Sequence, residues 1–191
     1  MDKQKALQNL IDLKKIFFVL NIPFWLEAGT CLGAIREKGF IGHDEDIDVG
    51  IYSESISETV ELTSLFFHLI ESGFRIYHTF GTLDNGFEVA VWRDGIKIDI
   101  FWFYPDKDKR IHSAWLNGGR NGLSDQLIYE YPAEIIEHLK EIDFYGEKFN
   151  VPAETEKYLE TKYGPDWRVP VKRWDWARGP RNLRDDGIFP F

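Results

Sequence analysis

Apolar residues recur at helical spacing in three parts of the chain. The run over residues 3–20 predicts a first helix, because its apolar positions lie three or four residues apart with Lys and Gln between them. The run over 57–72 predicts a second helix, with Ser55 and Glu58 as its capping box. A third helix is expected over 153–163.

Apolar and polar residues alternate roughly after the second helix, which is the pattern of half-buried strands. The predicted strands are residues 74–82, 87–92 and 96–104. Asp-Asn-Gly and Arg-Asp-Gly turns separate them and predict a meander. Residues 127–149 predict more extended structure with a hairpin turn at Gly146 and Glu147, although a short helix over 133–138 fits part of this region equally well.

The segment 25–51 combines a strand, a Gly-Thr turn, a short helix, a loop and a second strand. Successive side chains of a strand face opposite sides, so Asp46 and Asp48 project together while Ile47 and Val49 face the other way. Two carboxylates on one face repel unless a cation neutralises them, and hard oxygen ligands suit Mg²⁺ or Mn²⁺. A solvated acidic strand end is the alternative interpretation.

The residues before this acidic strand favour the metal interpretation. Gly29 and Thr30 break the preceding strand ahead of the helix predicted over 32–38, and the N–H groups at a helix start favour anions. Arg36 adds a cation close by. Together these features can hold the phosphates of a metal-bound nucleotide.

Asp99 lies in the apolar and aromatic strand predicted over 96–104 and shares its face with Lys97 and Phe101. An unpaired buried charge is costly, so this carboxylate has to be exposed at an edge, paired, or bound to a metal. We interpret Asp99 as a third member of the acidic cluster, with an edge or hairpin-end position as the alternative.

Composition narrows the class of protein. The 191 residues are 43% hydrophobic and 16% aromatic, which predicts a single folded domain over 1–191. A net charge of −9 argues against nucleic acid as a partner. The single cysteine, Cys31, excludes an internal disulfide and a Cys-rich zinc site, and it fits a cytoplasmic location. Without an apolar run of about 18 residues we expect no transmembrane segment, so membrane contact would be peripheral.

The stretch 166–191 is a basic, Trp-rich arm in an otherwise acidic chain. Packing on the domain is the preferred interpretation for its indoles. For its arginines, packing and binding of a phosphate are evenly balanced, and an indole could also lie beside a base. The Gly-rich run 118–122 has the composition of a phosphate loop, but no helix is predicted after it, so a flexible turn is preferred.

The segment 29–51 resembles the signature of the LicD/fukutin family, within the nucleotidyltransferase-like superfamily. Its matching positions are Gly29, Thr30, Gly33, Arg36, Gly39, Asp44, Asp46 and Asp48. Residues 163–170 resemble a later family landmark, and the strand around Asp99 fits the place of the third acidic residue. One departure is Gly42-His43, where relatives often have Pro-Trp, a change in the predicted pocket wall.

The resemblance implies an α+β fold with a nucleotidyltransferase-like mixed β-sheet flanked by helices. It also implies Mg²⁺-dependent transfer of a substituted phosphate, such as phosphocholine or ribitol phosphate, from a CDP-linked donor to a carbohydrate acceptor. The implied catalytic residues are Asp46, Asp48 and Asp99, with the metal on Asp46 and Asp48. The implied donor-phosphate residues are Gly29, Thr30, Gly33 and Arg36. Asp99 would join a metal or act as general base.

Two other functions remain open from the residues. A small-molecule nucleotidyltransferase shares the Gly-Thr turn and the acidic pair, although the insert 36–41 argues against it. A catalytically inactive domain of the same fold would use the aromatic residues to bind a carbohydrate or a protein partner.

Overall fold

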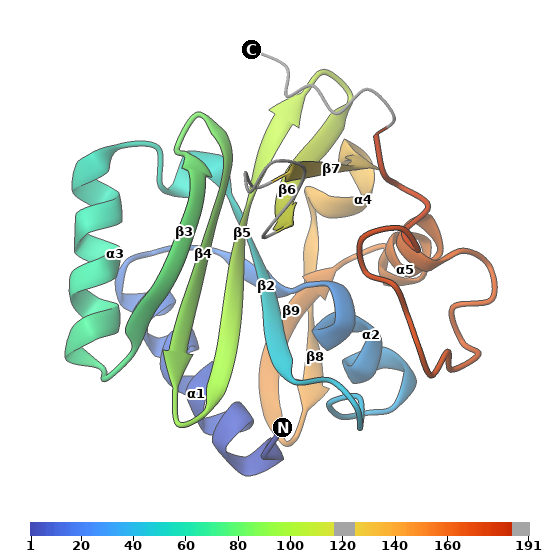
Figure 1. The fold of residues 1–191 in the computed structure, drawn as a ribbon, viewed down its shortest axis with the longest axis horizontal. Helices are drawn as coiled ribbons and strands as arrows, with labels where there is room; N and C mark the ends of the chain where they lie inside the picture. Colours follow the sequence, from blue (N-terminus) through green and yellow to red (C-terminus); the bar gives the residue numbers. More distant parts are fainter. Residues whose placement is uncertain (117–124, 185–191) are drawn as a thin grey trace.

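The computed structural model describes residues 1–116 and 125–184, and it contains a mixed β-sheet with helices around it (Figure 1). The main path of the sheet runs β1-β2-β5-β4-β3, while β6 pairs with β5 and β7. β2 and β5 are parallel, and their described neighbours pair antiparallel. The strands are β1 (Phe24–Leu26), β2 (Asp46–Tyr52), β3 (Arg75–Thr82), β4 (Asn85–Arg93), β5 (Ile96–Asp106), β6 (Lys109–Leu116), β7 (Asp125–Pro132), β8 (Leu139–Phe144) and β9 (Glu147–Pro152).

The helices flank this sheet. They are α1 (Lys3–Val19), α2 (Ala28–Arg36), α3 (Thr59–Glu71), α4 (Ala133–Ile136) and α5 (Thr155–Tyr163), with a 3-10 turn at Ser53–Ser55. α3 lies beside β3 at one side of the sheet, whereas α5 and the C-terminal arm (residues 166–184 of those described) lie at the opposite side (Figure 1). A mixed sheet flanked by helices confirms the predicted α+β class.

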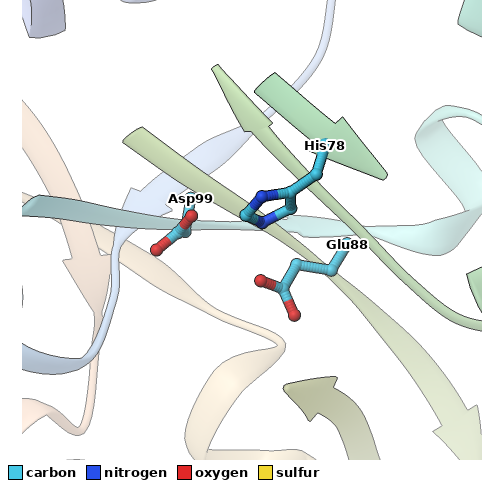
Figure 2. A group of neighbouring side chains, drawn as sticks. All are labelled: His78, Glu88 and Asp99. Carbon is cyan, nitrogen blue, oxygen red and sulfur yellow. The ribbon is translucent and has the colours of Figure 1, made fainter. Parts of the chain in front are cut away.

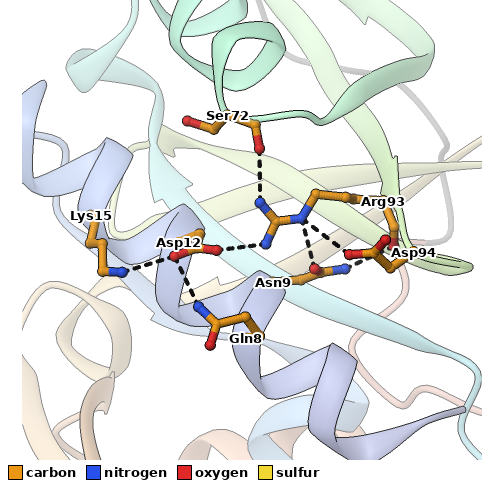
Figure 3. Close-up of polar contacts among 7 residues, drawn as sticks. All are labelled: Gln8, Asn9, Asp12, Lys15, Ser72, Arg93 and Asp94. Atoms are coloured by element: carbon orange, nitrogen blue, oxygen red, sulfur yellow. Dashed lines mark hydrogen bonds and ion pairs between the residues drawn. The ribbon is translucent and has the colours of Figure 1, made fainter.

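Arg93, at the turn between β4 and β5, ties α1 to the sheet (Figure 3). Its guanidinium donates to Asn9 Oδ1 at 2.8 Å, to Asp12 Oδ2 at 2.8 Å and to the carbonyl of Ser72 at 2.9 Å. Asn9 Nδ2 donates back to the carbonyl of Arg93 at 2.8 Å. These charge-assisted bonds join α1, the end of α3 and the meander at one place.

The predicted meander is present as β3, β4 and β5, and Gly73, with φ +84°, follows α3 as expected. The predicted capping box was wrong. The carboxylate of Glu61 accepts from the N–H groups of Ser57 at 2.7 Å and Glu58 at 3.1 Å, so Glu58 and Glu61 cap α3. Ser55 is the last residue of the 3-10 turn, which ends before the helix begins.

The region after β6 contains both structures expected for it. α4 follows β7, and β8 with β9 forms the hairpin. The hairpin turn is Tyr145-Gly146, one residue earlier than predicted, because both residues have the positive φ angles (+55° and +83°) of a type I′ turn. The Gly-rich run 118–122 lies outside the described residues. Within residues 1–116 and 125–184, no helix combines the length and apolar character needed to cross a bilayer.

Candidate active site

A cavity of about 840 Å³ opens on the sheet face that carries the acidic side chains. Residues of β2, β4, β5, α2, α5 and the C-terminal arm line it. This volume is in the range of pockets that bind nucleotide-sized ligands. Among the predicted site residues, Asp46, Asp48, Asp99, Gly29 and Arg36 line the cavity.

Parallel pairing of β2 with β5 brings the predicted acidic cluster together. Asp48 is the register partner of Asp99, and Asp46 is the register partner of Lys97. Partners on adjacent strands point to the same face, so all four side chains project toward the cavity. Lys97 Nζ lies 3.0 Å from Asp46 Oδ2 and 2.7 Å from Asp99 Oδ2. The edge alternative for Asp99 was wrong, since Asp99 is 5% exposed on a strand with neighbours on both sides.

Asp44, to which sequence reasoning assigned no role, joins the cluster from the loop before β2. Burial raises the pKa of Asp44 to about 7, and the nearby charge of Asp46 adds to the effect. Burial likewise raises the pKa of Asp48, again with contributions from the neighbouring carboxylates. Its place among the positions that match the family signature was the signal that could have identified it.

The donor set fits a hard divalent cation. Lys97 compensates part of the negative charge, yet Asp44 and Asp48 retain raised pKa values because their ionised forms are desolvated and face other carboxylates. Carboxylate oxygens are the ligands that Mg²⁺ and Mn²⁺ prefer. A cation held by Asp46 and Asp48 would therefore relieve a repulsion that the fold itself creates.

The four residues predicted to bind donor phosphates divide into two pairs. Gly29 and Arg36 line the cavity, whereas Thr30 and Gly33 are not among its described lining residues. Thr30 Oγ1 accepts from the N–H of Asp48 at 2.9 Å and so holds α2 against β2. A Cβ on Gly33 would lie 2.6 Å from the carbonyl oxygen of Gly39, so this glycine allows the loop after α2 to approach the helix closely. The structure gives Thr30 and Gly33 these packing roles instead.

α2 begins at Ala28, four residues before the start predicted at Leu32. Ala28 has φ +41° and its N–H donates to the hydroxyl of Tyr158 at 3.0 Å. Gly29 and Thr30 therefore belong to the first helical turn rather than to a separate turn. The start was missed because tertiary contacts, which the local sequence does not contain, outweigh the low helix propensity of these residues.

A buried ion pair supports the start of α2. Glu27, the N-cap residue of α2, is fully buried and accepts from Trp25 Nε1 at 3.1 Å and Lys162 Nζ at 3.4 Å. Lys162 lies 135 positions away, comes from α5 and also lines the cavity. Because a buried carboxylate without partners would be costly, these two donors fix Glu27 in place. Sequence reasoning missed both residues of this pair.

The C-terminal arm closes one side of the cavity. Trp167 is 5% exposed and Trp174 packs on α5, which agrees with the packing interpretation of the indoles. Arg36 Nη1 donates to the carbonyl of Trp167 at 3.1 Å and so links α2 to the arm. Lys172 and Arg173 are exposed and line the cavity, so the arm also presents cations to whatever binds there.

Comparison with known proteins connects this geometry to a family. Residues 21–154 match the model described as LicD/FKTN/FKRP, nucleotidyltransferase domain. The Homo sapiens protein named ribitol-5-phosphate transferase FKTN is 32% identical over 189 residues, which are 98% of this chain and 38% of that protein. Ribitol 5-phosphate transferase FKRP of Homo sapiens is 28% identical over 153 residues, 76% of this chain and 28% of that protein. The chain thus spans well under half the length of either relative.

Among solved structures, the antibiotic-resistance factor ANT(2'')-Ia has a TM-score of 0.42 and 14% identity, over 58% of this chain and 52% of that chain. The family match rests on the sequence and covers the segment from β1 through the β8–β9 hairpin, which includes every predicted acidic residue. The segment that carries the convergent carboxylates, and most of the mixed sheet, lies within this match. The chain therefore belongs to the LicD/FKTN/FKRP family.

Proposed function

We propose that this chain is a Mg²⁺-dependent transferase that moves a substituted phosphate from a CDP-linked donor to a carbohydrate hydroxyl. The observation that carries the proposal is the convergence of Asp46, Asp48 and Asp99 in a nucleotide-sized cavity of a LicD/FKTN/FKRP family member. Its relatives are named ribitol-5-phosphate transferases, which supports transfer of a phosphate-containing group. Ribitol phosphate and phosphocholine are the transferred groups we consider first.

Asp46 and Asp48 would hold the metal. Bound there, Mg²⁺ would neutralise charge on the donor diphosphate, and Mn²⁺ is the alternative ion. Gly29 lies directly beside the acidic residues, since a Cβ on it would lie 2.6 Å from Asp44 Oδ2 and 3.5 Å from Asp48 Oδ2. We propose that the metal-bound donor phosphates lie in the cavity next to the first turn of α2, where the helix N-terminus favours anions.

The basic arm would hold the rest of the donor. Lys172 and Arg173 line the cavity and are free to contact phosphate oxygens, and the exposed Trp176 offers an indole face to the cytosine base. Phosphoryl transfer depends mainly on positioning and charge stabilisation, so such contacts are the main contribution a protein can make.

The acceptor would approach from the side of Asp99. Asp99 Oδ2 is paired with Lys97, while its Oδ1 has no hydrogen-bond partner among the described residues. In the proposed reaction Asp99 takes the proton of the acceptor hydroxyl, and the acceptor oxygen forms a bond to the distal phosphorus of the donor. The bond from that phosphorus to the bridging oxygen breaks, and CMP leaves.

The test is thermal denaturation with CDP-ribitol, CDP-choline, CDP-glycerol or ATP, each with and without Mg²⁺. We expect one CDP-linked compound to raise the Tm by about 5–10 °C at a hundredfold excess over its Kd, only when Mg²⁺ is present. A shift with ATP alone would favour the small-molecule nucleotidyltransferase. No Mg²⁺-dependent shift with any of the four would favour a binding domain without activity.

A further inference from the structure

A second polar cluster lies on the face of the sheet that lines the cavity. It spans the three neighbouring strands β3, β4 and β5. His78 on β3 is the register partner of Ala90 on β4, and Ala90 is the register partner of Asp99 on β5. Glu88 is two residues from Ala90 along β4 and therefore faces the same side. Figure 2 shows the His78 ring and the two carboxylates turned toward one another on this face. The small side chain of Ala90 leaves the space between them open.

The spacing of these groups suits a shared ligand atom. One nitrogen of His78 and one oxygen each of Glu88 and Asp99 all lie within 4.8 Å of one another. All three residues line the large cavity, so a bound species would be reachable from it. Three side chains from three adjacent strands are held by the rigid hydrogen-bonded ladder rather than by a loop.

The two carboxylates are buried without enough partners. Glu88 is 6% exposed and Asp99 is 5% exposed, and Glu88 Oε2 and Asp99 Oδ1 have no hydrogen-bond partner among the described residues. Buried polar atoms are normally hydrogen-bonded, because leaving one unpaired costs the full desolvation penalty of that group. Two buried carboxylates beside one imidazole form a compact set of possible metal ligands.

Lys97 does not provide a hydrogen-bond partner for these two oxygens. Its ammonium group contacts Asp99 Oδ2 and Asp46 Oδ2, on the β2 side of Asp99. Asp99 Oδ1 and Glu88 Oε2 remain without a hydrogen-bond partner among the described residues, and the two carboxylates lie close to His78. Lys97 thus places a positive charge between Asp46 and the His78 cluster.

We propose that His78, Glu88 and Asp99 bind a divalent transition-metal ion, Zn²⁺ or Mn²⁺, at a site separate from Asp46 and Asp48. One imidazole and two carboxylates suit these ions better than Mg²⁺, which prefers oxygen ligands alone. Three protein ligands leave coordination positions open toward the cavity, as in catalytic zinc sites. A hydroxyl of the acceptor would occupy an open position, and this last consequence rests on the proposed function, whereas metal binding does not.

The test uses the full chain and Zn²⁺ or Mn²⁺ alone, without nucleotide. Isothermal titration should find a Zn²⁺ site that His78→Asn or Glu88→Gln weakens by at least about tenfold. Asp46→Asn should leave that site intact. With Mn²⁺ bound, electron spin-echo spectra should show one directly coordinated imidazole nitrogen, and this signal should disappear in His78→Asn.

His43→Asn is the matched control, because His43 lines the same cavity but lies outside the cluster. This variant should keep both the Zn²⁺ affinity and the nitrogen signal. Unchanged Zn²⁺ binding in folded His78→Asn, or no Zn²⁺ binding by the wild-type chain, would overturn the proposal. If the wild-type chain binds Zn²⁺ but shows no Mg²⁺-dependent binding of a CDP-linked donor, the result would count against the proposed function instead. The two failures are therefore distinguishable.

Discussion

Asp48 on β2 and Asp99 on β5 are direct register partners on adjacent parallel strands, although 51 positions separate them in the chain. Two carboxylates in this relationship face the same side. Burial raises the pKa of Asp48, and the charges of Asp46, Asp44 and Asp99 add to the effect. A fold that needed only stability would gain from replacing one of them. The proposed cation would offset this repulsion in the centre of the sheet, and this motivates the first prediction.

Asp46→Asn and Asp48→Asn should each reduce transfer at least about 100-fold while the fold is kept, because a metal-ligand oxygen becomes an amide in an isosteric side chain. Turnover with the best CDP-linked donor measures this, with circular dichroism as the check on folding. Asp84→Asn, in the exposed turn between β3 and β4, is the control and should behave as wild type. Wild-type turnover in a folded Asp48→Asn variant would contradict the assignment.

Gly29→Ala and Gly33→Ala should have different effects, although the two glycines lie on the same helix. The new Cβ of Gly29→Ala meets the Asp44 carboxylate, so Mg²⁺-dependent donor binding should weaken while the Tm stays within a few degrees. The new Cβ of Gly33→Ala meets the backbone oxygen of Gly39 at 2.6 Å, so stability should fall by about 1–3 kcal/mol. Thermal denaturation with and without donor separates the two; equal loss of stability in both would refute this division of roles.

Arg173→Ala should weaken donor binding, and Arg178→Ala should not. Both arginines are exposed on the C-terminal arm, but only the first lines the cavity among the described residues. The loss for Arg173→Ala should be about tenfold at low salt and smaller at high salt, since an exposed charge contact to phosphate is screened. Titration of the donor at two salt concentrations tests this, and the same Kd for both variants would show that the arm does not bind the donor.

Arg93→Ala should lower the free energy of unfolding by about 2–4 kcal/mol, because it removes three hydrogen bonds and leaves Asp12 and Asn9 with fewer partners. Arg93→Lys should recover part of the loss, since an ammonium group cannot reproduce the fork of contacts. Urea denaturation measures both. Neither variant should change donor affinity at a temperature where it is folded, because Arg93 is not among the described cavity residues.

His112 should make stability depend on pH. Burial, together with the nearby charge of Lys162, lowers the pKa of His112 well below 6.5, and its ring stacks on Phe103 and Tyr129. Below about pH 6.5 the unfolded chain therefore binds a proton that the folded chain does not, so this residue lowers stability as pH falls, by up to about 1.36 kcal/mol per pH unit.

His112→Phe should remove that contribution. Urea denaturation between pH 7.5 and 5.5 should show a smaller loss of stability for the variant than for the wild type. The comparison between the two proteins is required, because burial raises the pKa values of Asp44 to about 7 and Glu88 to about 8, and these groups act in the opposite direction over part of the range. Parallel curves for the two proteins would contradict the prediction.

Much of the local structure could be predicted from the sequence. The helix after Asp2, the meander from β3 to β5, and the common face of Asp46 and Asp48 follow from the 3.6-residue and two-residue periods of the backbone. Capping and turn boundaries were less predictable. Glu58, rather than Ser55, is the N-cap residue of α3, because several polar residues near a helix start compete for the same N–H groups.

The sequence by itself determined which side chains share a face, because alternation along a strand is a property of covalent geometry. Only the tertiary structure decided which faces meet. The register of β2 against β5 placed Asp48 opposite Asp99 and Lys97 between two acids, and the register of β3 and β4 added His78 and Glu88. Those pairings depend on packing between residues far apart in the chain, so no local pattern could predict them.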